Sequence, residues 1–136
     1  MATLPYLDSN ILLRYLRNDI PDQAERSRLL LERVERGELK VVLLPQVLFE
    51  VVFTLTRTYK VPRAAVREAL SAIIAVPGIQ LPNKSLYVRA LTMFETYNVP
   101  FVDAYIATVM HARGDTDIYS WDHDFDSLPH VRRLEP

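Results

Sequence analysis

The chain has 136 residues, of which 49% are hydrophobic and 24% are charged, and its formal net charge is −1. This length favours one domain with a sizeable core, and the charge argues against binding of nucleic acid through bulk positive charge. The absence of cysteine excludes disulfides, zinc–thiolate sites and thiol nucleophiles. We find no signal-peptide pattern and no apolar run that would span a membrane, and therefore expect a soluble, cytoplasmic protein.

Predicted strands and helices alternate along the chain. Apolar runs rich in β-branched residues indicate strands, and apolar residues at helical spacing indicate helices, with Pro, Gly and Asn at the breaks. In chain order we expect a strand at 4–8, helices at 9–16 and 23–36, a strand at 40–44, helices at 45–59 and 63–75, a strand at 79–81, helices at 84–97 and 101–112, and strands at 117–121 and 131–134. This alternation predicts an α/β fold with a mainly parallel sheet.

Four acidic residues stand where a carboxylate is costly. Asp8, Asp103 and Asp122 each follow an apolar run, and Glu50 lies within the apolar run 47–53. A buried carboxylate without a partner is strongly destabilising or becomes protonated. Four such groups make physical sense if they converge on a hard divalent cation such as Mg²⁺ or Mn²⁺, because these ions take oxygen ligands.

The predicted fold gives these acids a common location. Sites in open parallel sheets form at the carboxyl ends of the strands, and Asp8 and Asp122 both end predicted strands. Asp103 falls in the first turn of a helix, where the helix dipole favours negative charge. Glu50 lies in mid-helix among apolar neighbours, so we expect it to point into the protein or into a cleft.

Each acid also has an ordinary structural explanation. Asp8 could cap the following helix, and Asp103 could simply complement the helix dipole. Glu50 could form a salt bridge with an arginine such as Arg57 or Arg113.

The residues around the last acid carry further alternatives. Asp122, Asp124 and Asp126 could form a solvated turn, which is the interpretation we prefer for Asp126. Trp121 is expected to pack against the protein, although its place in the sequence leaves base stacking open. Arg14 could contact an RNA phosphate or could belong to a solvated helix face.

Taken together in order, these motifs resemble the signatures of the PIN-domain nucleases. The matching segments are LDSNIL at 7–12, Glu50 on a later helix, VDAYIA at 102–107 and SWDHDF at 120–125. The resemblance runs from about Leu4 to Leu134 and implies a single PIN-like nuclease domain over residues 1–136. The implied fold has three layers, with a mainly parallel central sheet of four to five strands flanked by helices. Proteins of this kind and size are mostly similar to VapC, the toxin of a toxin–antitoxin pair.

The resemblance also implies roles for individual residues. It assigns catalytic and metal-holding roles to an acidic quartet, an auxiliary role at the metal to a fifth acid, and supporting roles to two serines. The quartet is Asp8, Glu50, Asp103 and Asp122, the fifth acid is Asp124, and the serines are Ser9 and Ser120. The motif here reads Ser-Trp-Asp where Thr-X-Asp is commoner, but the hydroxyl is retained.

The implied activity is that of an endoribonuclease that uses Mg²⁺ or Mn²⁺ to hydrolyse RNA phosphodiester bonds. The implied substrates are of the tRNA or rRNA class, and the implied partners are a cognate antitoxin protein and a second copy of the chain in a homodimer. A housekeeping PIN nuclease and a catalytically idle PIN scaffold that binds a partner protein are the alternatives. A signalling receiver domain is disfavoured because 79–81 offers no aspartate and no lysine follows Lys84.

Overall fold

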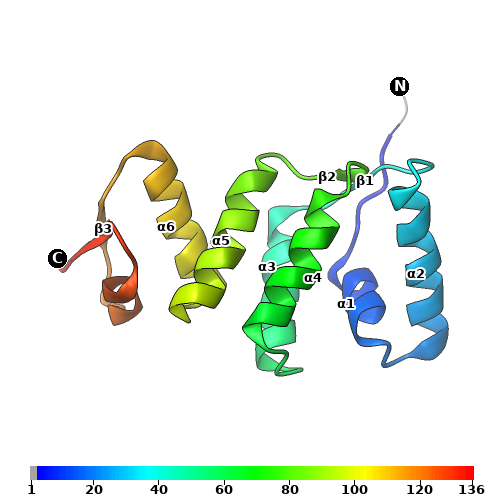
Figure 1. Cartoon of the computed structure of the whole chain (residues 1–136), viewed down its shortest axis with the longest axis horizontal. Coiled ribbons are helices and arrows are strands. Elements are labelled where there is room, and N and C mark those ends of the chain that lie inside the picture. Colours follow the sequence, from blue (N-terminus) through cyan, green and yellow to red (C-terminus); the bar gives the residue numbers. More distant parts are fainter. Residues whose placement is uncertain (1–2) are drawn as a thin grey trace. The chain divides into compact units, whose positions relative to one another are not determined.

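The computed structural model describes residues 3–136 as two compact units, the first ending at Lys84 and the second running from Ser85 to Pro136. Figure 1 shows the elements along the chain in sequence colours. Within the described residues there are six α-helices, four short strands and one 3-10 helix.

The first unit contains three extended segments that run parallel, with β1 in the middle. β1 (Val41–Val42) pairs with β2 (Ile79–Gln80) on one side. On the other side Tyr6 forms a parallel bridge with Val42, and the Leu7 N–H donates to the Val42 carbonyl at 2.9 Å. The predicted first strand is therefore present as a bridged segment, and Asp8 follows its carboxyl end.

Four helices complete the first unit, and local sequence signals explain their bounds. They are α1 (Ser9–Arg17), α2 (Pro21–Glu35), α3 (Pro45–Arg57) and α4 (Arg63–Ala75). Proline opens α2 and α3, where its missing N–H would have no helical partner. Gly37, with φ of 77°, follows α2 in the left-handed conformation, and its N–H donates to the Val34 carbonyl at 3.1 Å. The core consists of the buried faces of these helices and of the parallel segments.

The second unit joins two helices to a parallel strand pair. Its elements are α5 (Lys84–Tyr97), α6 (Phe101–Arg113), β3 (Asp117–Tyr119), the 3-10 helix η1 (His123–Ser127) and β4 (Arg132–Leu134). β3 and β4 pair in parallel along their whole length. Phe94 meets Phe101 edge to face with ring centroids 6.1 Å apart, and Tyr87 stacks on Tyr105 at 5.2 Å. These aromatic contacts join α5 to α6.

The predicted order of strands and helices is confirmed. The helix over 63–75 has the predicted bounds, and the strands are shorter than predicted. Two differences concern pairing and turns. The four strands form two separate parallel pairs within the described residues, so the single sheet of four to five strands stays a prediction, as does the single domain. The 3-10 helix was not foreseen, because its sequence resembles a polar turn.

No helix in the described part of the chain combines the length and the apolar character that crossing a membrane requires.

Gly78 supplies a test of the packing in the first unit. A Cβ atom there would lie 2.8 Å from Val34 Cγ1 and 3.0 Å from the carbonyl oxygens of Val34 and Leu39. We therefore expect Gly78→Ala to destabilise the protein by about 1–3 kcal/mol, because the end of α2 must shift. Chemical unfolding would measure this loss. The control is Gly37→Asn, which adds a side chain in open space at a φ that Asn tolerates. Equal stability of the two variants would contradict the close packing.

Candidate metal centre

Three of the predicted acids meet in the second unit. Asp103 comes from the first turn of α6, Asp122 precedes η1, and Asp124 lies within η1. Each offers one carboxylate oxygen, and the three oxygens lie within 4.8 Å of one another. The turn after β3 and the start of α6 thus bring together residues that are distant in the sequence.

Asp103 is the least satisfied of the three carboxylates. Pro100 starts α6, and Asp103 sits in its first turn, as predicted. The residue is half-buried, and its Oδ2 atom is shielded from solvent without a hydrogen-bond partner in the described part of the chain. An unpartnered buried oxygen is unfavourable, so this atom would gain from a cation.

The loop after β3 holds Asp122 and Asp124 through short polar contacts. The Ser120 hydroxyl accepts a hydrogen bond from the Asp122 N–H at 2.9 Å. The Oδ1 atom of Asp122 accepts one from the Asp124 N–H, also at 2.9 Å, and the Ser120 N–H donates to the Leu134 carbonyl at 3.1 Å. Ser120 therefore connects the strand pair to Asp122, consistent with a supporting role.

The electrostatics of the cluster suit a divalent cation. The pKa of Asp103 is raised to about 6, and burial is the largest cause. The negative charges of Asp122 and Asp124 and a hydrogen-bonding interaction with Asp122 raise it further. The neighbouring negative charges disfavour ionisation of Asp103, and a cation beside it would relieve this repulsion. The donors are all carboxylate oxygens, the ligand type that Mg²⁺ and Mn²⁺ prefer. The residues therefore fit such an ion.

Asp8 has the capping role that we considered as its ordinary explanation. It is the N-cap of α1, and its Oδ1 atom accepts a hydrogen bond from the Ser9 N–H at 2.8 Å. Asp8 is exposed, whereas Ser9 is buried. Capping engages one carboxylate oxygen of Asp8.

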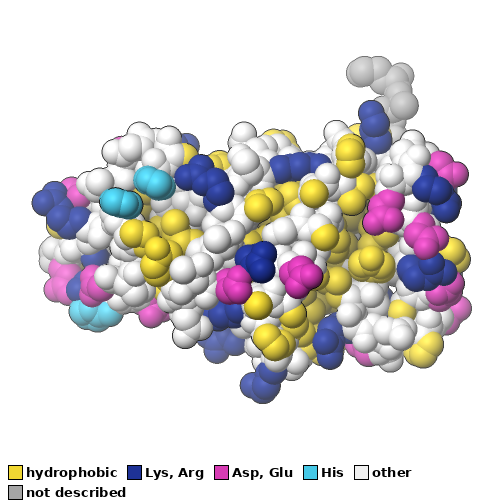
Figure 2. All heavy atoms as spheres, viewed as in Figure 1, with side chains coloured by type: hydrophobic (Ala, Val, Ile, Leu, Met, Phe, Trp, Pro, Cys, Tyr) yellow, Lys and Arg dark blue, Asp and Glu magenta, His cyan; other side chains and the backbone are white. Residues whose placement is uncertain are grey.

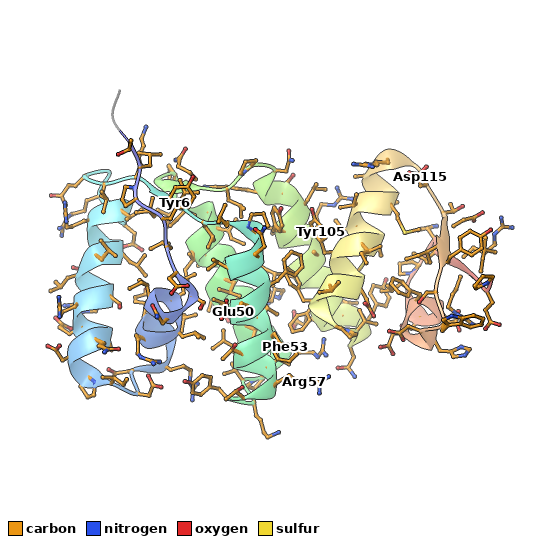
Figure 3. All side chains as sticks on the ribbon, turned by 180° about the vertical axis from the view of Figure 1, so that it is seen from behind. Tyr6, Glu50, Phe53, Arg57, Tyr105 and Asp115 are labelled. Carbon is orange, nitrogen blue, oxygen red and sulfur yellow. The ribbon has the colours of Figure 1, made fainter. Side chains whose placement is uncertain are left out.

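Glu50 is exposed, so it does not point into the core of the protein, and its predicted place in a cleft stays a prediction. It shares the outer face of α3 with Phe53 and Arg57, as Figure 3 shows. Phe53 is 62% exposed, and the Arg57 guanidinium lies over its ring at 5.9 Å. The apolar run around Glu50 is explained by the opposite face of α3, whose buried residues are Leu48, Val51, Val52 and Leu55.

Arg14 takes part in polar contacts within the first unit. Its Nε donates to Gln23 at 3.1 Å, and its Nη1 lies 3.5 Å from the Asp19 carboxylate. A hollow of about 430 Å³ opens between α1 and α2, and two of its lining residues, Arg14 and Arg26, are arginines. Its remaining lining residues are Asn10, Ile11, Gln23, Ser27 and Leu30.

The structure changes the interpretation of two residues in the second unit. Trp121 is 67% exposed, so the prediction that it packs is wrong. Arg133 went unnoticed, although its Nη1 donates to the Ser120 carbonyl at 3.0 Å. The only signal in the sequence was the basic pair Arg132-Arg133 within a predicted strand.

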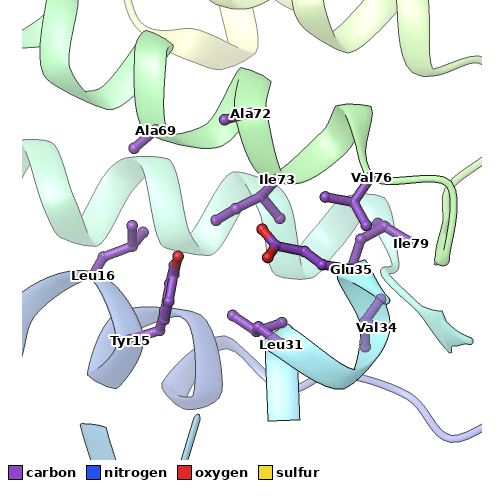
Figure 4. Close-up of a pocket in the computed structure, with 10 residues that line it drawn as sticks. All are labelled: Tyr15, Leu16, Leu31, Val34, Glu35, Ala69, Ala72, Ile73, Val76 and Ile79. Carbon is purple, nitrogen blue, oxygen red and sulfur yellow. The ribbon is translucent and has the colours of Figure 1, made fainter. Parts of the chain in front are cut away.

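A separate pocket of about 180 Å³ lies in the first unit between α1, α2 and α4. Figure 2 shows hydrophobic side chains gathered between α2 and α4. Figure 4 shows the Glu35 carboxylate among Tyr15, Leu31 and Ile73. Among the described residues that line this pocket, Glu35 is the one charged side chain, so they do not repeat the set of acids found in the metal centre.

A family model described as PIN domain matches residues 6–131. No curated protein matches the chain.

The metal centre can be tested by removing the charge of Asp103 and measuring the stability of the folded protein. The folded protein holds a proton on Asp103 with a pKa of about 6, against the ordinary value of 3.8. The metal-free protein therefore loses stability from this group as the pH rises from about 4 through about 6. We expect Asp103→Asn to raise the melting temperature of the metal-free protein at neutral pH, and Mn²⁺ to stabilise the wild type but not Asp103→Asn.

Thermal unfolding at acidic and neutral pH, with and without Mn²⁺, measures both effects. Asp115→Asn is the matched control, since Asp115 is exposed just beyond α6 and outside the cluster. Equal stabilisation of wild type and Asp103→Asn by Mn²⁺ would count against the site.

Proposed function

The chain belongs to the PIN domain family, whose members are typically metal-dependent nucleases, and on this basis we propose that it is an endoribonuclease that uses Mg²⁺ or Mn²⁺. The observation that supports this most directly is the cluster of Asp103, Asp122 and Asp124, in which one oxygen is buried without a partner. A cation held there would activate water and stabilise charge on the phosphate.

The residues of the chain supply the binding and orientation in this proposal. Asp103 presents its carboxylate from the rigid first turn of α6. Asp122 keeps its orientation because its Oδ1 atom holds the Asp124 N–H. Asp124 contributes a further negative charge from η1. No histidine is needed as a general base in such a site, because a bound cation would lower the pKa of the attacking water.

We extend the proposal to Asp8 and Glu50 on the strength of the ordered family motifs. Both carboxylates are exposed in the first unit, and Asp8 retains one oxygen outside its capping bond. Buried Ser9 supports Asp8 through its backbone N–H. These assignments rest on the motifs, and mutation tests them independently of the cluster.

RNA is the expected substrate, and the proposal places it in the tRNA or rRNA class. Unpaired bases of structured RNA are read by stacking on aromatic side chains. The exposed indole of Trp121 stands next to Asp122 in the chain and offers such a surface. The net charge of −1 makes local contacts more important than bulk attraction.

The biological role that we propose is that of a toxin restrained by a cognate antitoxin protein, acting as a homodimer in the cytoplasm. This part rests on the resemblance to VapC-like toxins. The apolar pocket of the first unit supports a protein partner, because its single carboxylate, Glu35, would suit an apolar segment that carries one basic side chain. A housekeeping nuclease would have the same metal centre but no such partner.

Loss of an acid should abolish cleavage. We expect purified protein with Mg²⁺ or Mn²⁺ to cut RNA at few positions, and Asp103→Asn or Asp122→Asn to lower the rate by more than about a hundredfold. Asp8→Asn and Glu50→Gln should also lower it strongly if the quartet acts together. Sequencing of 5′ ends in RNA from the native source measures the cuts, with Asp115→Asn as control.

Undiminished cleavage by Asp103→Asn would refute the proposal, and a folded wild type without cleavage would favour the idle scaffold.

Arg14 provides a test of RNA binding away from the metal. If Arg14 contacts a phosphate in the hollow between α1 and α2, Arg14→Gln should weaken RNA binding without sequence preference. The slope of log affinity against log salt should fall by about one. Filter binding with catalytically inactive Asp103→Asn protein avoids cleavage during the measurement. Arg36→Gln is the control, because Arg36 pairs with Glu38 outside the hollow. An unchanged salt slope would remove Arg14 from the interface.

A further inference from the structure

We infer that Arg133 is a positioning residue of the metal centre, which holds the loop 120–126 so that Asp122 and Asp124 face Asp103. The inference rests on the proposed metal-dependent function. Arg133 lies on β4, which pairs in parallel with β3, and the loop begins where β3 ends. Its side chain can therefore reach the loop.

The burial of Arg133 is unusual for its type. Its side chain is only 10% exposed, whereas arginine side chains are mostly exposed. A buried charge is retained at low cost only where several hydrogen bonds satisfy it. The contacts of the Arg133 guanidinium meet this condition.

The guanidinium of Arg133 binds the loop on both sides of the two acids. Its Nη1 donates to the Ser120 carbonyl at 3.0 Å, before Asp122. Its Nε donates to Asp126 Oδ1 at 3.0 Å, beyond Asp124. One rigid planar group thus fixes the two ends of the segment that carries both acids.

Two further contacts complete the environment of Arg133. Its Nη1 also donates to Glu135 Oε1 at 2.9 Å, and its Nη2 lies 3.1 Å from His123 Nδ1. The two carboxylates that face it, Asp126 and Glu135, lie outside the metal cluster. The positive charge of Arg133 is therefore balanced without use of the carboxylates of Asp122 or Asp124, which keep their affinity for a cation.

Ser120 connects Arg133 to the acids. Its carbonyl accepts from Arg133, and its hydroxyl accepts from the Asp122 N–H. Asp122 in turn accepts from the Asp124 N–H. Loss of the Arg133 guanidinium would release the first member of this chain of hydrogen bonds.

Arg132 offers a matched comparison on the same strand. Its side chain is 71% exposed and forms a two-point ion pair with Asp117 on β3, with Nε to Oδ1 at 2.9 Å and Nη2 to Oδ2 at 2.7 Å. Arg132 therefore joins the strands at the end remote from the loop. Removing it takes away the same charge without the loop contacts.

The experiment compares Mn²⁺ affinity in the metal-free full chain, measured by electron paramagnetic resonance of free Mn²⁺. We expect Arg133→Met to bind Mn²⁺ about 10-fold or more weakly, as for other residues that orient metal ligands. Arg133→Lys, which keeps the charge but not the fork of donors, should lie between Arg133→Met and wild type. Arg132→Met should bind as wild type does.

Hydrogen exchange at the Asp122 and Asp124 amides supplies a readout that needs no metal. Both amides should exchange faster in Arg133→Met than in Arg132→Met. Unchanged Mn²⁺ affinity and exchange in Arg133→Met would overturn the inference, as would equal losses in Arg132→Met. If Arg133→Met fails to fold, Arg133→Lys decides the question by the same two measurements.

Failure of the proposed function would give a different result. A folded wild-type protein that binds no Mn²⁺ would refute the metal centre itself. Amide exchange in the Arg133 variants would then still show whether Arg133 holds the loop.

Discussion

The second unit holds three carboxylates close together against their mutual repulsion. Asp103, Asp122 and Asp124 are held with oxygens within 4.8 Å of one another, although like charges at such distances oppose folding. The surrounding structure resists this force: α6 fixes Asp103, and the β3–β4 pair fixes the start of the loop. A unit that keeps such an arrangement would give up some stability, and a bound cation would restore it.

The carboxylates of the chain differ in how well the protein satisfies them. Asp8 and Asp122 each accept a backbone N–H, at 2.8 and 2.9 Å. Asp103 has one buried oxygen without a partner among the described residues, and its pKa is raised to about 6. Asp103 is therefore the carboxylate that would gain most from a bound cation. This contrast separates two carboxylates that cap a helix start from one that has a buried oxygen without a partner among the described residues.

Local patterns in the sequence predicted most of the elements, because caps, prolines and helical periodicity act over a few residues. The role of Asp8 at the start of α1 and the place of Asp103 in the first turn of α6 were predictable for this reason. The exposure of Glu50 was not, because the apolar run around it is explained by the opposite face of α3. Arg132 and Arg133 are adjacent arginines, so local sequence patterns do not separate their roles. The contacts that differ between them come from segments distant in the sequence.

The bond between Asp122 Oδ1 and the Asp124 N–H also limits how Asp122 can bind a ligand. Oδ1 then keeps one free lone pair, so the other oxygen of Asp122 is the one that is freer to reach a cation. Ligation through one oxygen occupies fewer positions around an ion than ligation through two, and Mg²⁺ characteristically keeps several waters. A hydrogen bond that shapes a turn thereby also leaves room around the ion for molecules other than the protein.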